Sequence, residues 1–225
     1  MNIEEFRDIY VISDGFYPVD SKEKEFDFCL PICNAYGYFI ELGVWFGRSI
    51  NYMASKYPKY HFYGFDTFEG VNEIWETGGK TVDMSRFQIS DVDMDGNSGL
   101  PKVRENVTLT KGLFQDTLGK WLDKHEGHIS FINMDPDIYS ATIYALETLN
   151  ERIVPGTIIR FDELCDWRDV NFPGWDANNN HQISVYTTWK DGEWKALNEW
   201  IEKYDRQVKP IWRNWHQSAG VQVIK

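Results

Sequence analysis

The sequence predicts an α/β fold in which a mostly parallel, doubly wound sheet carries helices on both faces. Strand-like apolar runs and helix-like segments alternate along the chain from Phe39 to Glu163, as a parallel sheet with crossover helices requires. Several of the strand-like runs also end in a carboxylate. In such sheets ligands bind in the crevice at the carboxyl ends of the strands, so we expect the functional site there.

Composition places limits on domain number and partners. The chain has 225 residues and no linker-like stretch, so we expect a single domain over 1–225. A net charge of −12 and a pI near 4.8 disfavour nucleic acid and anionic membranes as partners. The start of the chain lacks a signal-peptide pattern, and no apolar run is long enough to span a bilayer. We therefore expect a soluble, cytoplasmic protein.

The three cysteines, Cys29, Cys33 and Cys165, match no zinc-binding spacing. Cys29 and Cys33 lie one helical turn apart, and a shared metal stays an alternative for them. Small buried apolar side chains are the interpretation that we favour.

The N-terminal region, residues 1–37, is predicted to form an arm or lid over the sheet. A loop through Phe16 precedes a helix that Ser21 caps and that runs towards Pro31.

The first strand is predicted at Tyr38–Leu42, followed by a tight turn and a helix over Ser49–Lys56. Gly43 and Gly47 in the turn would let the backbone approach a cofactor closely. The alternative is a turn that binds no cofactor, because the full G-x-G-x-x-G pattern is absent.

The second strand, His61–Asp66, also ends in an acid. Asp66 lies 25 residues after Glu41, close to the spacing at which α/β cofactor folds place a carboxylate for ribose hydroxyls. A helix cap is the alternative reading of Asp66.

A polar loop is predicted over 72–102, as a lid or a contact between subunits of a homodimer. Its segment Asp91-Val92-Asp93-Met94-Asp95-Gly96 is similar to the start of a calcium loop, but the twelfth position is Lys102 instead of Glu.

The remaining elements continue the alternation. Strands are predicted over 107–110, 128–134 and 157–161, with helices over 113–125 and 140–152 between them. After a second long loop over 164–189, the sequence predicts a helix over 190–203 and an antiparallel pair of strands over 207–212 and 219–224. Seven of the ten tryptophans follow residue 165, and packing is their expected role, with a wall for a sugar or ring as the alternative.

Four acids follow two consecutive strands: Asp135, Asp137, Asp162 and Glu163. The sheet would bring them into one crevice, where like charges raise each other's pKa unless a cation intervenes. Carboxylate oxygens suit Mg²⁺ or Ca²⁺, which would acidify a bound hydroxyl. The alternative is that Asp137 and Asp162 only cap the segments that follow.

Five motifs taken together resemble a known family. They are Glu41–Ser49, Gly64–Gly70, Lys111–Leu118, Met134–Thr142 and Pro155–Glu163. In this order they resemble the macrocin O-methyltransferase (TylF-type) family of class I S-adenosylmethionine-dependent enzymes. The resemblance implies a Rossmann-like methyltransferase fold whose seven-stranded, mostly parallel sheet has an antiparallel C-terminal strand.

The resemblance also implies roles for individual residues. The cofactor-binding residues would be Glu41, Gly43, Gly47, Arg48, Ser49, Asp66, Thr67, Phe68, Gly112, Phe114 and Asp135. In this set Asp66 takes the ribose hydroxyls, and Thr67 and Phe68 lie near the adenine.

For the metal, the resemblance implies Asp135, Asp162 and Glu163 as ligands, with Asp137 as the general base. The chain departs from the family pattern at Pro136, where Gly or Cys is more common, and at Glu163, where a second Asp is more common.

The resulting hypothesis is methyl transfer from S-adenosylmethionine to a hydroxyl of a small molecule, such as a sugar or a glycosylated metabolite, with Mg²⁺ or Ca²⁺ as second cofactor. A metal-independent methyltransferase, a nicotinamide-dependent oxidoreductase and a non-catalytic S-adenosylmethionine-fold interaction module are the alternatives.

Overall fold

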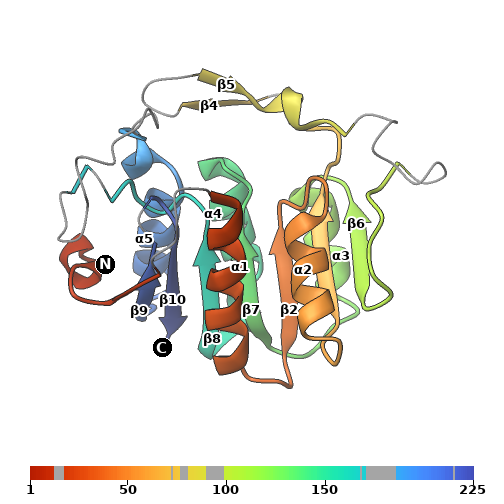
Figure 1. The fold of residues 1–225 in the computed structure, drawn as a ribbon, viewed down its shortest axis with the longest axis horizontal. Coiled ribbons are helices and arrows are strands. Elements are labelled where there is room, and N and C mark those ends of the chain that lie inside the picture. Colours follow the sequence, from red (N-terminus) through yellow and green to blue (C-terminus); the bar gives the residue numbers. More distant parts are fainter. Residues whose placement is uncertain are drawn as a thin grey trace.

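An eight-stranded sheet in the order β1-β9-β10-β8-β7-β2-β3-β6 forms the centre of the molecule (Figure 1). The computed structural model describes residues 1–12, 18–71, 73–76, 81–89, 99–167, 169–170, 186–214 and 216–225. The strands of the sheet are β1 (Tyr10–Val11), β2 (Tyr38–Leu42), β3 (Phe62–Asp66), β6 (Val107–Lys111), β7 (Ile129–Met134), β8 (Ile153–Phe161), β9 (Val208–Arg213) and β10 (Ala219–Val223). The α-helices are α1 (Pro18–Cys29), α2 (Arg48–Lys56), α3 (Phe114–Leu122), α4 (Tyr139–Thr148) and α5 (Glu193–Lys203). Short 3₁₀ turns are η1 (Ile3–Phe6), η2 (Leu30–Ile32), η3 (Met84–Phe87), η5 (Asn150–Arg152) and η7 (Trp189–Asp191).

The predicted fold class is confirmed, with one strand more than expected. Only β10 runs against the other strands, because it pairs antiparallel with both β8 and β9. The prediction of seven strands missed β1, in which Tyr10 and Val11 pair parallel with Trp212 and Arg213 of β9. Two residues carry too little periodicity to be recognised as a strand. They pair because β9 would otherwise leave its outer N–H and C=O groups unpaired.

Strands β2, β3, β7 and β8 divide their apolar side chains between two cores. In β2, Ile40 and Leu42 point into the core under α3, α4 and α5, and Phe39 points into the core under α1 and α2. This alternation explains why the strands are apolar on both sides, since helices cover both faces of the sheet (Figure 1).

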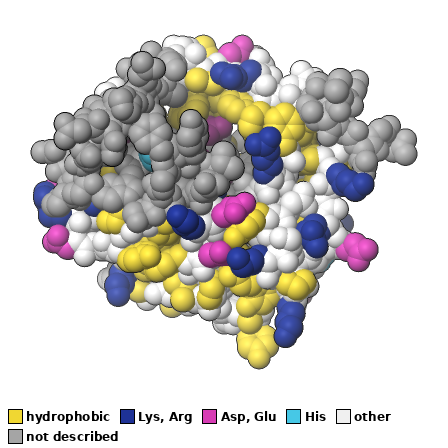
Figure 2. Space-filling view, in the orientation of Figure 1, with side chains coloured by type: hydrophobic (Ala, Val, Ile, Leu, Met, Phe, Trp, Pro, Cys, Tyr) yellow, Lys and Arg dark blue, Asp and Glu magenta, His cyan; other side chains and the backbone are white. Residues whose placement is uncertain are grey.

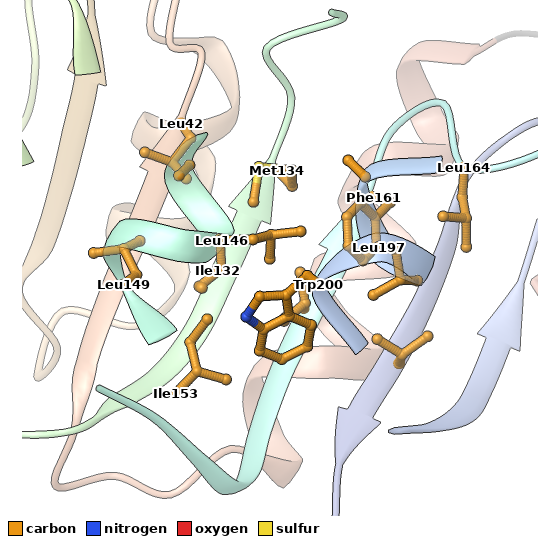
Figure 3. Close-up of a cluster of buried hydrophobic side chains, with 14 of the residues drawn as sticks. Leu42, Ile132, Met134, Leu146, Leu149, Ile153, Phe161, Leu164, Leu197 and Trp200 are labelled. Carbon is orange, nitrogen blue, oxygen red and sulfur yellow. The ribbon is translucent and has the colours of Figure 1, made fainter. Parts of the chain in front are cut away.

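The larger core joins α4 and α5 to the sheet (Figure 3). Leu146 of α4 and Leu197 of α5 lie against strand residues such as Ile132, and Trp200 closes the cluster. The Trp200 indole donates a hydrogen bond to Asn150 Oδ1 at 3.0 Å, which satisfies its buried N–H.

Most of the described tryptophans confirm the packing prediction. Trp167, Trp189, Trp200 and Trp212 are almost fully buried. Trp175 and Trp215 lie outside the described residues.

The N-terminal region differs from its prediction in one detail. The helix begins at Pro18, so Ser21 lies inside it and the predicted N-cap is wrong. Proline fits the first turn of a helix, where its missing N–H costs nothing.

The three cysteines are buried and free, as predicted. Burial raises the pKa of Cys29 to about 12, so it stays a neutral thiol.

Other elements also differ from their predicted bounds, and α4, for example, ends at Thr148 instead of residue 152. Strand β8 begins at Ile153, four residues early, because Ile153 pairs with Ile129 across a register shift. Within 72–102, the described residues include a two-stranded antiparallel sheet of β4 (Ile74–Glu76) and β5 (Thr81–Asp83), where a loop was predicted. The similarity to a calcium loop at 91–96 lies outside the described residues.

Strands β4 and β5 pass over the carboxyl ends of the central strands, and we call them the roof (Figure 1). Ser140 Oγ at the start of α4 donates to the Glu73 carboxylate at 2.8 Å. Trp75 Nε1 donates to Tyr186 Oη at 3.3 Å, and Thr188 Oγ1 donates to the Glu76 carbonyl. These three hydrogen bonds connect the roof and the neighbouring Glu73 to the start of α4 and to the segment before η7.

No helix in the described part of the chain combines the length and the apolar character needed to cross a membrane.

Candidate active site

A cavity of about 960 Å³ opens at the carboxyl ends of the strands. Its walls come from α1, the turn after β2, the start of α4 and the residues next to the roof. Figure 2 shows that the face bearing α1 and α2 is hollowed below the hydrophobic side chains of its upper rim. The size suits a cofactor together with a small substrate.

The turn after β2 depends on its two glycines. Gly43 has φ +87°, and an added Cβ would collide with the carbonyl oxygen of Asp135. Gly47, with φ +73°, is the N-cap of α2. Only glycine adopts these angles without strain, and its small size lets the turn lie against the backbone that follows β7.

Asp66 holds this turn in place. Its Oδ2 accepts hydrogen bonds from the backbone N–H groups of Val44 at 2.7 Å and Trp45 at 2.8 Å. Its Oδ1 accepts from the N–H of Phe68 at 2.7 Å. Trp45 and Phe68 both have positive φ angles, 46° and 57°, so the carboxylate stabilises two strained residues.

The structure brings most of the predicted cofactor residues to the cavity. The lining includes Gly43, Arg48, Ser49, Asp66, Thr67, Gly112, Phe114 and Asp135. Glu41, Gly47 and Phe68 are not among the lining residues, and Phe68 is buried in the core under α1 and α2.

Among the described residues, the buried acid Glu41 finds a hydrogen-bond partner for only one of its two carboxylate oxygens. Asn133 Nδ2 donates to its Oε1 at 2.7 Å, whereas its Oε2 has no hydrogen-bond partner among the described residues. Burial, followed by the negative charge of Asp135, raises the pKa of Glu41 to about 8. Glu41 is therefore protonated at neutral pH in the absence of a ligand.

The predicted acids meet in the crevice, but they do not form a single cluster. One oxygen each from Asp135, Asp137 and Glu163 lies within 4.8 Å of the others. Asp162 instead directs Oδ1 towards the Arg160 guanidinium and Oδ2 towards Lys22 Nζ, at 2.9 Å. Of the predicted metal ligands, Asp135 and Glu163 therefore lie together, and Asp137 takes the position expected for Asp162.

Asp137 has an unusual backbone. Its φ is +65°, and the N–H of Ile138 bonds to the carbonyl of Pro136 at 2.7 Å, which makes a three-residue turn centred on Asp137. Burial and then the charge of Asp135 raise the pKa of Asp137 well above its usual value. A strained, proton-binding carboxylate in a crevice is typical of a catalytic site.

The pKa values of the neighbouring acids Asp135 and Asp162 shift in opposite directions. Burial and then Asp162 raise the pKa of Asp135 to about 7. Burial alone would raise the pKa of Asp162 too, but Lys22 and Arg160 hold it well below the usual range.

Three charged residues of the site were missed by the sequence analysis. Lys22 of α1 contacts Asp135, Glu25 of α1 pairs with the buried Arg160 at 2.6 Å, and Glu193 at the start of α5 accepts from the N–H of Glu163 at 3.0 Å. Glu25 and Glu193 are fully buried. In the sequence they resemble solvent-exposed helix residues, and only an acid at a helix start, as for Glu193, gave any local signal.

The acid side of the crevice has the donors that a hard divalent cation requires. Asp135, Asp137 and Glu163 supply carboxylate oxygens, and the buried Glu163 Oε2 has no partner among the described residues. Oxygen ligands of this kind suit Mg²⁺ or Ca²⁺.

The eight-stranded sheet, with a glycine turn after β2 and an acid at the end of β3, has the Rossmann-like fold of solved methyltransferases. Residues 33–193 match the sequence profile of the family described as macrocin-O-methyltransferase (TylF), so the chain belongs to that family. Its members are S-adenosylmethionine-dependent O-methyltransferases, and this chain is such an enzyme.

Solved structures agree with this fold. CalS11, a calicheamicin methyltransferase, is 19% identical with a TM-score of 0.58 and covers 90% of this chain and 79% of its own. The O-methyltransferase NovP is 16% identical with a TM-score of 0.57, covering 91% and 80%. An O-methyltransferase from Bacillus cereus, solved with S-adenosylhomocysteine, is 13% identical with a TM-score of 0.51, covering 93% and 82%. No curated protein matches the sequence.

Proposed function

We propose that this enzyme methylates a hydroxyl group on a sugar or a glycosylated small molecule. The observation that carries the proposal is the placement of Asp137 beside the cofactor turn, in one cavity with Gly43 and Asp66. CalS11 is described as a TDP-rhamnose 3′-O-methyltransferase, which supports a sugar as the acceptor.

S-adenosylmethionine, when bound, supplies an electrophilic methyl group on a positively charged sulfur. Asp66 and the turn at Gly43 would hold it, since the turn offers close backbone approach and the carboxylate accepts hydroxyl hydrogen bonds. Residues of α1 and residues next to the roof line the cavity, where they would limit the access of water and orient the acceptor.

Asp137 would act as the general base. Its raised pKa makes its carboxylate, in the deprotonated form, a stronger base than a solvent-exposed aspartate, so this form takes the proton from the acceptor hydroxyl more readily. Its fixed turn holds the oxygen in one place during the transfer.

Asp135 and Glu163 would hold a divalent cation with Asp137 beside them as the base, and the cation would lower the pKa of a bound hydroxyl. The same transfer without a metal is the second candidate, and the ammonium of Lys22 between Asp135 and Asp162 favours it. Activity after treatment with a chelator, measured with and without added Mg²⁺, separates the two.

The test is a pair of measurements on D137N. Asparagine tolerates positive φ, so the turn is kept while the base is lost. We expect S-adenosylhomocysteine to bind within about threefold of wild type by calorimetry, and methyl transfer to nucleotide-activated or glycosylated sugars to fall by about 10²–10⁴-fold.

The exposed Asp123 at the end of α3 provides the control variant, D123N, which should behave as wild type. Full turnover by D137N would remove Asp137 from the role of base. Failure of the wild type to bind S-adenosylhomocysteine would contradict the proposed cofactor site.

A further inference from the structure

The Lys22 side chain reaches from α1 into the acid side of the crevice. Its Nζ lies 3.0 Å from Asp135 Oδ2 and 2.9 Å from Asp162 Oδ2. The side chain is one-third exposed, and the two carboxylates are mostly buried, at 15% and 11% exposure. One ammonium therefore bridges the acids that end two neighbouring strands, β7 and β8.

The Lys22 ammonium balances the negative charge of Asp135 and Asp162, one pair of the four acids in the crevice. Asp162 has Lys22 on one oxygen and the Arg160 guanidinium on the other, so it needs no further cation. Within the described part of the chain, Glu163 Oε2 lacks any hydrogen-bond partner, and the acids Asp135, Asp137 and Asp162 all act on Glu163 with negative charge. The positive charge of the crevice is thus concentrated at Asp162.

The position of Lys22 is also the position that a bridging metal ion would need. The metal-binding set expected from the sequence included Asp135 and Asp162 together. An ammonium and a divalent cation cannot occupy the space between two carboxylates at the same time, because each makes contacts of about 2–3 Å to the same oxygens.

We propose that Lys22 is a positioning residue that serves as the resident cation of the Asp135–Asp162 pair and excludes divalent metal ions from it. The proposal rests on the proposed function only in taking this crevice as the catalytic site. It predicts that Asp162 joins a metal-binding set only after Lys22 leaves, and that α1, which carries Lys22, contributes directly to the ion content of the site.

Other contacts of α1 make this arrangement testable by a point mutation. Phe26 and Cys29 pack in the core under α1 and α2, and Glu25 pairs with Arg160. Removal of the Lys22 charge should therefore leave the helix docked.

The experiment is calorimetric titration of Mg²⁺ into the cofactor-free, full-length protein. K22Q removes the charge with a polar side chain, K22M repeats the change with an apolar one, and K22R keeps the charge. Thermal melting of each variant establishes that it is folded. We expect K22Q and K22M to bind Mg²⁺ at least tenfold more tightly than wild type, and K22R to bind within about threefold of it.

Two controls distinguish Mg²⁺ binding at the position that Lys22 leaves from an effect of the changed net charge alone. K111Q removes an ammonium that pairs with the exposed Glu69, at 2.7 Å, and should change Mg²⁺ affinity by less than about threefold. The double variant K22Q/D162N should lose the gain, because Asp162 is the ligand that Lys22 releases.

The proposal is overturned if K22Q and K22M bind Mg²⁺ no more tightly than wild type, including the case in which no variant binds it. It is also overturned if K111Q gains as much as K22Q, or if K22Q/D162N keeps the gain. Binding of S-adenosylhomocysteine, measured on the same samples, reports separately on the proposed function.

Discussion

The two sides of the crevice solve the problem of buried charge in opposite ways. The donor side, where the methyl donor would bind, consists of the turn at Gly43–Trp45 and Asp66. On this side a single carboxylate accepts three backbone hydrogen bonds. On the acid side, which consists of Asp135, Asp137, Asp162 and Glu163, carboxylates crowd together, and one buried oxygen has no partner among the described residues.

The difference shows which side of the crevice has its polar groups hydrogen-bonded before a ligand binds. Satisfied hydrogen bonds fix the donor side in its binding shape, which lowers the cost of ordering it around a cofactor. The acid side keeps unfavourable electrostatic energy that a cation, a proton or a substrate hydroxyl can relieve. Variants of each side should therefore behave differently, and the following changes test this from the largest expected effect to the smallest.

The G43A variant should damage the donor side most. The added Cβ meets the Asp135 carbonyl in a backbone conformation that alanine tolerates poorly, so we expect a loss of about 4 kcal/mol in the free energy of unfolding. Urea unfolding and S-adenosylhomocysteine titration measure the two consequences, and binding should be lost.

The control is G119A in α3, where an added Cβ meets nothing within 4 Å. Alanine is the better helix former, so G119A should be more stable than wild type by about 1 kcal/mol. Wild-type binding by G43A would show that the close contact at Gly43 is unimportant.

The E41Q variant should stabilise the ligand-free protein at neutral and higher pH. The pKa of Glu41 is about 8 in the folded protein, against an ordinary value of 4.5, so between these pH values the folded state holds one more proton than the unfolded state. Stability of the wild type therefore falls as pH rises through this window, by on the order of 3 kcal/mol at pH 7.

Glutamine cannot ionise, so the decline should be smaller in E41Q. Thermal melting between pH 4.5 and 8.5 should show the two proteins converging at the acid end and E41Q melting several degrees higher at pH 8. The exposed Glu105 provides the control, E105Q. Parallel melting curves for wild type and E41Q would contradict the assigned proton.

The D66N variant should weaken cofactor binding by about 10–100-fold. Asparagine has one acceptor oxygen in place of two, so at least one of the N–H groups of Val44, Trp45 and Phe68 loses a charge-assisted partner. Titration with S-adenosylhomocysteine measures the effect. The control is E69Q, an exposed acid nearby, and equal losses in both variants would argue against a specific role for Asp66.

The S140A variant should have the smallest effect, because it touches neither side directly. It removes the hydroxyl that ties α4 to Glu73 next to the roof, at a cost of about 1 kcal/mol. Amide hydrogen exchange in β4 and β5 should rise by about five- to tenfold. S55A removes a similar exposed hydroxyl on α2 and should leave this exchange unchanged.

The sequence predicted the sheet well because its strands are long apolar runs separated by amphipathic helices. The glycine turn, Asp66 and the grouping of acids followed from their positions at strand ends, which the topology brings together. What it missed depends on contacts between distant segments. Strand β1 exists because β9 has a free edge, 202 residues further along the chain from Tyr10 to Trp212.

The same limit applies to the site. Lys22 and Asp135 are separated by 113 residues, and a lysine on a polar helix has no local feature that distinguishes it from a surface lysine. The orientation of Asp162 away from Asp137 follows from Arg160 and Lys22, so it could not be read from the acid pair alone.

The close contact between Gly43 and the backbone at Asp135 has a further consequence for how this enzyme can evolve. Asp135 N also bonds to the Leu42 carbonyl at 2.9 Å, so the two halves of the crevice are joined through the main chain. The distance between the methyl donor and the acids is therefore fixed by the sheet itself. The roof attaches through a few side chains, so it can diversify to admit new acceptors without disturbing the transfer geometry.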